Sequence, residues 1–354
     1  MKNILLILLF VTTQVFSQKG KLDSLFASQK DFSGVVLIAE NEKPVYYKAF
    51  GYREFESQVP LQKTDIFELA SVSKQFTAMI IMILHERGEL NYDDSVSKYL
   101  EIPYKGITIR NLLTHTSGLP DYQAIMDQYW DKTKVAGNAD CIEYLNKYAP
   151  PKLFEPGEKY TYSNTGYLLL ASIAEKISGE DFIALCRSWI FKNLKMKSSD
   201  IRSLEEKKKI KNFAIGHMYV EERNKYVRAD SFPSSNYTIW LGNRKGPGRI
   251  SSTAADLLKW DRYLYGNYLI KQTTLEDAFT PMKLNNGELS YYGFGWEIST
   301  DPVAGRIVQH NGDNPGYKTQ IVRLIDKKKT IIVLNNNAVQ NFSQLIKQLI
   351  EIVK

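Results

Sequence analysis

The chain contains little cysteine and little histidine, and both shortages exclude kinds of site. Only two cysteines, Cys141 and Cys186, and four histidines occur among 354 residues. Neither cysteine has a histidine nearby in the sequence, which disfavours a thiol nucleophile, and no His-Glu-x-x-His or other metal-ligand spacing occurs. We therefore expect no metal and no other cofactor. We also expect both cysteines to be buried free thiols, although export would permit a disulfide.

Long apolar runs are missing after the N-terminus. The most apolar later segment, Ala78 to Leu84, has seven residues, whereas a membrane-spanning helix needs about 20. The first residues differ, because Lys2 precedes the apolar run Ile4 to Val11 and a short stretch that ends at Ser17. This pattern predicts a signal peptide at 1–17, cleaved near Ser17, and a secreted or periplasmic protein without stable membrane insertion. The alternative is a buried N-terminal strand.

The chain has only a modest excess of positive charge. The formal net charge is +7, and the lysine clusters at 207–209 and 327–329 each follow acidic residues. Such local clusters are typical of a solvated surface, and no nucleic-acid-binding motif accompanies them. We expect no nucleic-acid partner; the expected partner is a small-molecule or peptide substrate. The sequence does not indicate an oligomeric state.

Strand-like patterns occupy both ends of the chain. Residues 34–52 read as two strands joined by a polar turn, and 291–337 as several more, followed by an amphipathic helix. Most of the chain between them has helical patterns, and a capping pair, Thr253 and Asp256, begins one later helix. We predict the α+β class, with an antiparallel sheet flanked by helices and a mainly helical subdomain inserted. One domain would cover 18–354, with an α/β part at about 18–88 and 249–354 and a helical part at about 89–248.

The tetrapeptide SVSK, a serine three residues before a lysine, occurs twice. The copy at Ser95–Lys98 follows two aspartates, and its apolar residues would leave Ser95 and Lys98 on a wet surface. The copy at Ser71–Lys74 opens a helix that is apolar on every face, which indicates burial. Desolvation lowers the pKa of a lysine, so Lys74 could become a base for Ser71. The alternative is an ordinary helix-capping serine.

Four segments in order carry a family resemblance. They are FELASVSKQFTA, ITIRNLLTHTSGLPDY, FEPGEKYTYSNTGYLLLASIAEKISG and HNGDNPGY. Together they resemble the serine β-lactamase and penicillin-binding-protein superfamily, in the branch of class C β-lactamases, D-alanyl-D-alanine carboxypeptidases and related esterases. The resemblance covers about residues 20 to 350. It implies a serine β-lactamase-like fold and a serine hydrolase that forms an acyl-enzyme on an amide, ester or lactam carbonyl.

The resemblance also implies a catalytic set. Ser71 matches the nucleophile and Lys74 the lysine of Ser-x-x-Lys, while Tyr162 and Asn164 match Tyr-x-Asn. A phenol beside an ammonium becomes more acidic, so Tyr162 and Lys74 could transfer protons as one unit. Which of the two accepts the serine proton stays open. Asn164 could donate to the substrate carbonyl or hold Lys74.

The remaining implied residues would bind substrate. His310-Asn311-Gly312 stands where the superfamily has Lys-Thr-Gly, and the backbone N–H groups of Ser71 and Asp313 would form the oxyanion hole. His310 departs from the pattern, because an imidazole is cationic only below a pKa near 6.5. It would either bind a substrate carboxylate as a cation or, as we favour, shape the site as a neutral hydrogen-bond donor. The other histidines are predicted to be structural. The alternative function is a catalytically silent protein that binds or senses cell-wall peptides.

Overall fold

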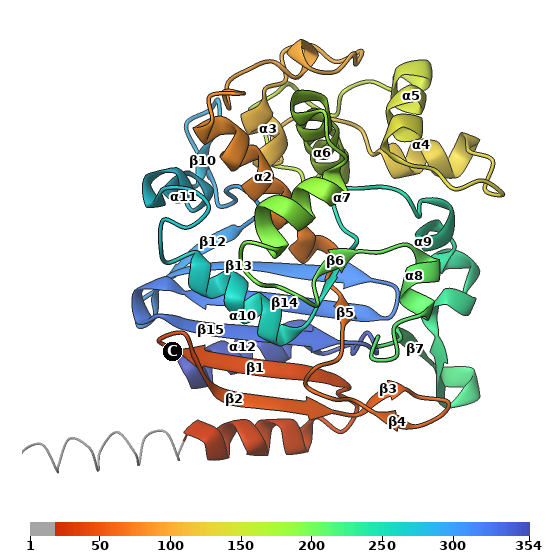
Figure 1. The fold of residues 1–354 in the computed structure, drawn as a ribbon, viewed down its shortest axis with the longest axis vertical. Coiled ribbons are helices and arrows are strands. Elements are labelled where there is room, and N and C mark those ends of the chain that lie inside the picture. The colour runs from red at the N-terminus through yellow and green to blue at the C-terminus, as the bar shows by residue number, and fades with distance from the viewer. Residues whose placement is uncertain (1–17) are drawn as a thin grey trace, which may run out of the picture.

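The computed structural model describes residues 18–354, so the predicted signal peptide lies outside the described residues. A six-stranded antiparallel sheet forms the base of the molecule (Figure 1), in the order β12-β13-β14-β15-β1-β2. Both chain ends build it, as the sequence predicts. Its strands are β1 (Gly34–Glu40), β2 (Lys43–Phe50), β12 (Glu297–Asp301), β13 (Gly305–Asn314), β14 (Tyr317–Leu324) and β15 (Lys329–Asn335).

The first hairpin shows how the sequence sets the sheet. Strand β1 is apolar and buried from Gly34 to Ala39, and it pairs with β2 on one side and β15 on the other. Asn41 and Glu42 connect β1 to β2 with φ values of +47° and +65°. Two consecutive positive φ values are the signature of a type I′ turn, whose twist matches that of the flanking strands. The predicted strand–turn–strand at 34–52 is therefore confirmed.

Successive side chains of each central strand pack into different cores, because strand residues alternate between the two faces of a sheet. Val36 and Ile331 pack on one face against α12 (Phe342–Val353) and a helix at 18–28. Leu37 packs on the other face, in a larger core that includes Met79 and Leu169 of the helical part. That core is continuous between the sheet and the helices, which fixes the two parts against each other.

The helical part covers the upper side of the sheet in Figure 1. Its central helix, α2, is buried at every position from Lys74 to Leu84, as its apolar sequence predicts. Helix α2 spans Lys74–Glu86. The helices that follow it in this part are α3 (Ile109–Leu113), α4 (Tyr122–Tyr129), α5 (Asn138–Tyr148), α6 (Asn164–Ser178) and α7 (Phe182–Leu185).

Short elements complete the fold. Thr253 caps α10 by accepting a hydrogen bond from the Asp256 N–H at 3.1 Å, as predicted. The region expected to be mainly helical also holds the hairpin β7–β8. The elements are β3 (Tyr52–Glu54), β4 (Val59–Pro60), β5 (Phe67–Glu68), β6 (Asp200–Ile201), α8 (Leu204–Lys208), β7 (His217–Val220), β8 (Lys225–Arg228), α9 (Tyr237–Trp240), β9 (Ile250–Ser252), α10 (Ala254–Tyr263), α11 (Gln272–Ala278), β10 (Met282–Lys283) and β11 (Leu289–Ser290).

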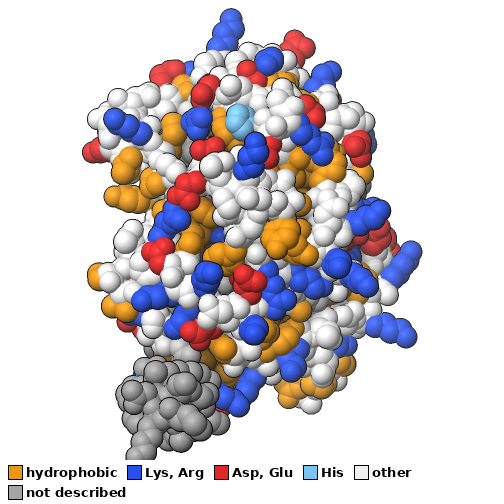
Figure 2. All heavy atoms as spheres, turned by 60° about the vertical axis from the view of Figure 1, so that its left-hand side comes forward, with side chains coloured by type: hydrophobic (Ala, Val, Ile, Leu, Met, Phe, Trp, Pro, Cys, Tyr) orange, Lys and Arg blue, Asp and Glu red, His pale blue; other side chains and the backbone are white. Residues whose placement is uncertain are grey.

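Several surface and composition predictions can be compared with the described residues. Cys141 and Cys186 are buried and unpaired, as expected. Lys207 departs from the predicted solvated cluster, because its side chain is only 11% exposed and pairs with Glu68. Basic and acidic side chains are interspersed over the face drawn in Figure 2. Within residues 18–354, no helix has the length and apolar character needed to cross a membrane.

Candidate active site

Ser71 lies in a tight 3-10 turn, η1 (Ala70–Ser73), immediately before α2. Ala70 has a φ of +48°, in the left-handed region that non-glycine residues rarely adopt. Surrounding strands hold this turn in place. The N–H of Leu69 donates to the Ile250 carbonyl at 2.8 Å, and the Leu69 carbonyl accepts from the Thr319 hydroxyl at 2.7 Å. Ser71 is thereby presented from a backbone fixed between β9 and β14.

Lys74 is fully buried, and its Nζ has three polar neighbours. It lies 3.1 Å from Ser71 Oγ, 2.8 Å from Asn164 Oδ1 and 2.9 Å from the Pro247 carbonyl oxygen. The amide and carbonyl oxygens can only accept hydrogen bonds. A neutral amine would use its two N–H bonds for these oxygens and would direct its lone pair toward the Ser71 hydroxyl.

Two causes favour that neutral amine. Burial lowers the pKa of Lys74 well below its ordinary value, and the positive charge of Arg244 lowers it further. No carboxylate forms an ion pair with Lys74 within the described chain. The sequence reasoning missed both Arg244 and Pro247, because the Gly-Pro-Gly at 246–248 reads only as a loop signal.

Tyr162 lies against Lys74 through its ring. Lys74 Nζ is 4.7 Å from the ring centroid, and Tyr162 is 39% exposed. Burial raises the pKa of Tyr162 above its ordinary value, and its contact with Ser71 opposes this only in part. The expected acidification of the phenol is therefore wrong in direction, because burial outweighs the influence of the neighbouring groups.

Asn164 begins α6, and the residue before it is anchored by a buried histidine. The Ser163 hydroxyl caps the helix by accepting from the Gly166 N–H, while the Ser163 N–H donates to His115 Nδ1 at 3.0 Å. Burial lowers the pKa of His115, so its ring is neutral. His115 thus fixes the backbone between Tyr162 and Asn164, in keeping with its predicted structural role.

His310 lies beside the site but does not face a substrate with a free nitrogen. It is fully buried on β13, with Nδ1 at 2.6 Å from the Asn311 carbonyl and Nε2 at 2.8 Å from the Tyr292 hydroxyl. A carbonyl only accepts, so Nδ1 carries the proton and Nε2 accepts from the tyrosine. Burial lowers the pKa of His310 to about 3. The geometry agrees with the favoured neutral imidazole, but the expectation that it donates a hydrogen bond to substrate is wrong, because its one N–H is used by the Asn311 carbonyl.

Gly312 allows β13 to approach the turn that carries Ser71. A Cβ at Gly312 would lie 2.2 Å from the Leu69 carbonyl oxygen and 2.3 Å from Thr319 Oγ1, closer than atoms can pack. The next residue, Asp313, has a 69% exposed side chain whose carboxylate lies 4.0 Å from Lys318 Nζ. Strand β12 pairs with β13 only as far as Gln309. One edge of β13 at Asp313 therefore has no strand partner, and its backbone lies next to the Ser71 turn.

The second SVSK copy lies on the surface, as predicted. Ser95 is exposed, and its hydroxyl contacts only the Ser97 hydroxyl at 2.7 Å. Lys98 Nζ lies 2.9 Å from an Asp94 carboxylate oxygen, which raises the pKa of Lys98. A lysine held as a cation in water cannot serve as a base for Ser95.

Two further features concern what the site could hold. Among residues 18–354, no group of three or more His, Cys, Asp or Glu side chains is arranged to hold a metal ion. A cavity of about 530 Å³ lies beside Tyr292, with Tyr160 and Glu297 among its other lining residues. Burial raises the pKa of Glu297. This cavity is large enough for a small organic ligand.

Comparisons with known proteins identify the family of this chain. A family model described as Beta-lactamase matches residues 18–351. The chain is 40% identical to penicillin-binding protein 4* of Bacillus subtilis over 325 residues, 90% of this chain and 72% of that protein. It is 26% identical to a beta-lactamase of Escherichia coli over 299 residues, 82% of this chain and 72% of that protein.

The fold comparison points the same way. A solved penicillin-binding protein from Bacillus halodurans matches with a TM-score of 0.79 and 25% identity, over 93% of this chain and 98% of that one. The predicted α+β, serine β-lactamase-like fold is thereby confirmed. The chain belongs to the beta-lactamase family.

Proposed function

We propose that this protein is a serine hydrolase that works through an acyl-enzyme on Ser71. The observation that carries the proposal is the buried Lys74 amine, whose two acceptor neighbours leave its lone pair for the Ser71 hydroxyl. Membership of the beta-lactamase family supports a hydrolase of this kind. The substrate would be an amide, ester or lactam carbonyl, carried by a small molecule or a peptide.

In the first step, Ser71 Oγ attacks the carbonyl carbon while its proton passes to Lys74 Nζ. The C–O bond to serine forms, and the carbonyl π electrons move to the oxygen. Collapse of this intermediate breaks the bond to the leaving group, which takes the proton back from Lys74. Water then attacks the acyl-enzyme by the same route in reverse and releases the acid. A neutral amine of lowered pKa can both accept the proton and return it near neutral pH.

The other residues of the site would stabilise the oxyanion and position the groups that react. We assign the oxyanion hole to the backbone N–H groups of Ser71 and Asp313, supported by the contact of Gly312 with the Ser71 turn. Tyr162, whose pKa is raised, would act as a neutral phenol that relays a proton to the leaving group. Asn164 would orient Lys74 through its Oδ1 and could offer its amide N–H to substrate.

Active-site labelling tests the proposal. A fluorophosphonate should add one adduct to the wild-type protein, mapped by mass spectrometry to Ser71, and none to Ser71→Ala. Ser95→Ala is the matched control, since it removes the serine of the surface copy of the same tetrapeptide, and it should label at the wild-type rate. A protein that binds peptides without catalysis would give no adduct and no turnover of chromogenic β-lactams, D-amino-acid peptides or short esters. That result would favour the silent-binding alternative.

Export is a separate proposal, based on the sequence pattern at 1–17. If the segment is a signal peptide, protein recovered from the periplasm or medium should begin near Gln18. N-terminal sequencing of the recovered protein tests this, and an intact Met1 would contradict it.

A further inference from the structure

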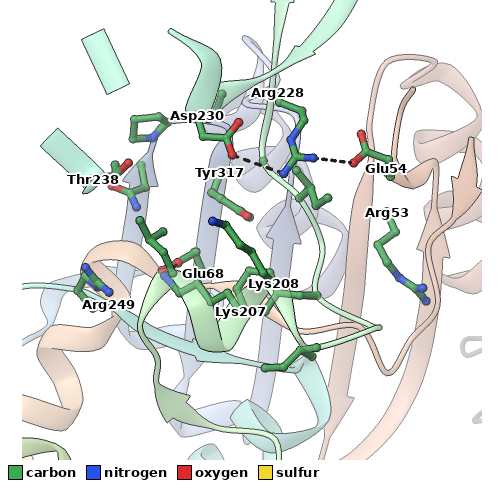
Figure 3. Close-up of a pocket in the computed structure, with 18 of the residues that line it drawn as sticks. Arg53, Glu54, Glu68, Lys207, Lys208, Arg228, Asp230, Thr238, Arg249 and Tyr317 are labelled. Carbon is green, nitrogen blue, oxygen red and sulfur yellow. Dashed lines mark hydrogen bonds and ion pairs between the residues drawn. The ribbon is translucent and has the colours of Figure 1, made fainter. Parts of the chain in front are cut away.

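A cavity of about 500 Å³ lies near the candidate active site, where α8, β8, α9 and the turn after β13 meet (Figure 3). Residues 314 and 315, which directly follow Asp313, line it. Arg244 and Arg249 also line it, and in the sequence they flank Pro247, whose carbonyl contacts the Lys74 amine. The cavity contains none of the side chains assigned above to catalysis.

The lining carries an excess of positive charge, because seven basic and three acidic side chains contribute to it. All three acids are already engaged. Arg228 lies 3.4 Å from an Asp230 oxygen and 3.7 Å from a Glu54 oxygen, as the dashed lines in Figure 3 show. Glu68 pairs with Lys207. The second oxygen of that carboxylate, Oε2, has no hydrogen-bond partner among the described residues, and its charge also acts on Arg249, so one carboxylate offsets two cations only in part.

Two guanidinium groups in the lining, those of Arg244 and Arg249, form no direct ion pair among the described residues. Arg249 is 7% exposed, and its Nη2 donates to the Arg202 carbonyl at 2.8 Å, but its Nε has no hydrogen-bond partner among the described residues. Nε and Nη1 of Arg244 are also buried without a partner there. Burial lowers the pKa of Arg249; the nearby Glu68 opposes this and the charge of Arg244 reinforces it. Buried charges are normally paired, so this pair of arginines favours an external anion.

Many of the other lining residues are apolar, which indicates that a bound anion would also carry an apolar part. Aliphatic, aromatic and proline side chains lie around the same space as the two arginines. They are Val59, Leu204, Ile210, Phe213, Ile215, Pro315 and Tyr317. A ligand that fills a cavity of this size would place an apolar body on these residues and a charged group on the guanidiniums.

We propose that this cavity binds an organic anion, with a carboxylate or phosphate group held by Arg244 and Arg249 and an apolar body packed beside them. Guanidinium groups match the planar or tetrahedral oxygens of these anions through paired N–H donors. The site supplies the positive charge that the neutral His310 cannot supply. We further infer that the anion belongs to the substrate or to a ligand that binds next to it. This second inference rests on the proposed function.

The experiment uses the Ser71→Ala protein, so that binding is measured without turnover. Calorimetric titration at fixed ionic strength compares hexanoate, hexyl phosphate and the uncharged hexanamide, with inorganic phosphate as the head group alone. We expect at least one of the two amphiphilic anions to bind, and hexanamide and inorganic phosphate to bind at least tenfold more weakly. The better of the two anions identifies the head group.

Substitutions then locate the site. Arg244→Gln should weaken binding of the better anion at least tenfold, and Arg249→Lys, which keeps the buried charge but loses the planar fork, should weaken it less. Arg228→Gln is the matched control: this arginine lines the same cavity but already has two carboxylate partners, so binding should change less than threefold. Equal affinity for hexanoate and hexanamide, or unchanged anion binding in Arg244→Gln, would overturn the proposal. Because binding is measured without Ser71, failure here leaves the labelling test of the proposed function unaffected.

Discussion

The charge state of Lys74 can be changed by a single isosteric substitution. Asn164 Oδ1 accepts a hydrogen bond from Lys74 Nζ at 2.8 Å. Asn164→Asp keeps the shape and the acceptor oxygen but adds a negative charge at that distance. A carboxylate there stabilises the ammonium form, so the pKa of Lys74 should rise and the amine should lose its lone pair at neutral pH.

The size of the effect follows from the distance. Two unit charges at 2.8 Å in an effective dielectric constant of 20 attract by roughly 6 kcal/mol, which is an upper bound because the new carboxylate is itself desolvated. Opposite charges in contact shift a pKa by about 1–3 units. Each unit lowers the neutral fraction of Lys74 about tenfold once its pKa exceeds the working pH. We therefore expect acylation at pH 7 to slow by about 10- to 1,000-fold.

The assay is the rate of fluorophosphonate labelling from pH 6 to pH 10. Because the substitution raises the pKa of the base, the rising limb of the profile should move to higher pH, and labelling by Asn164→Asp should recover partly in alkali. Asn164→Ala is the control; it removes the same hydrogen bond without adding charge, so its loss should not be recovered at high pH. A wild-type rate and pH profile in Asn164→Asp would refute Lys74 as the proton acceptor.

Local patterns in the sequence predicted the fold class and the buried helix at Lys74, and the family resemblance predicted the residues around Ser71. Alternating and continuous apolar runs identified β1, β2 and β13 to β15, and the all-apolar face of α2 identified a buried helix at Lys74. The two copies of SVSK could be distinguished because burial depends on the flanking residues, which differ. The structure brings Ser71, Lys74, Tyr162 and Asn164 together across 93 residues of sequence, from 71 to 164.

What sequence reasoning could not supply were the contacts set by tertiary packing. Arg244 lies in a segment without a helix or strand pattern in the sequence, yet its charge lowers the pKa of Lys74. His310 seemed to be available to substrate, but its two nitrogens are used by Tyr292 and the Asn311 carbonyl. No local pattern reveals such partners, because they come from distant segments whose approach depends on the whole core.

Three further predictions test the site. Lys74→Ala and Tyr162→Phe should each remove most of the labelling rate. The double variant should lose far less than the product of the two single losses, since the effects of residues that form one proton-transfer unit are not additive. Losses that multiply would contradict a shared role. Gly312→Ala should destabilise the protein by about 1–3 kcal/mol in chemical denaturation and slow labelling of Ser71, because the new Cβ would clash with the Leu69 carbonyl. Gly20→Ala is the control, because nothing lies within 4 Å of the Cβ it would add. It should neither destabilise the protein nor slow labelling. The last prediction concerns His310, whose pKa of about 3 in the folded protein lies below the ordinary 6.5, so the unfolded chain binds a proton that the folded chain does not between these values. Its stabilising contribution is fully present above pH 6.5 and is lost as the pH falls toward 3, by about 1.4 kcal/mol per unit, or about 2 kcal/mol at pH 5. Urea denaturation at pH 7 and pH 5 should therefore show a smaller loss of stability in His310→Gln than in the wild-type protein, whatever the variant's absolute stability, and an equal loss in the two proteins would show that His310 titrates normally in the fold.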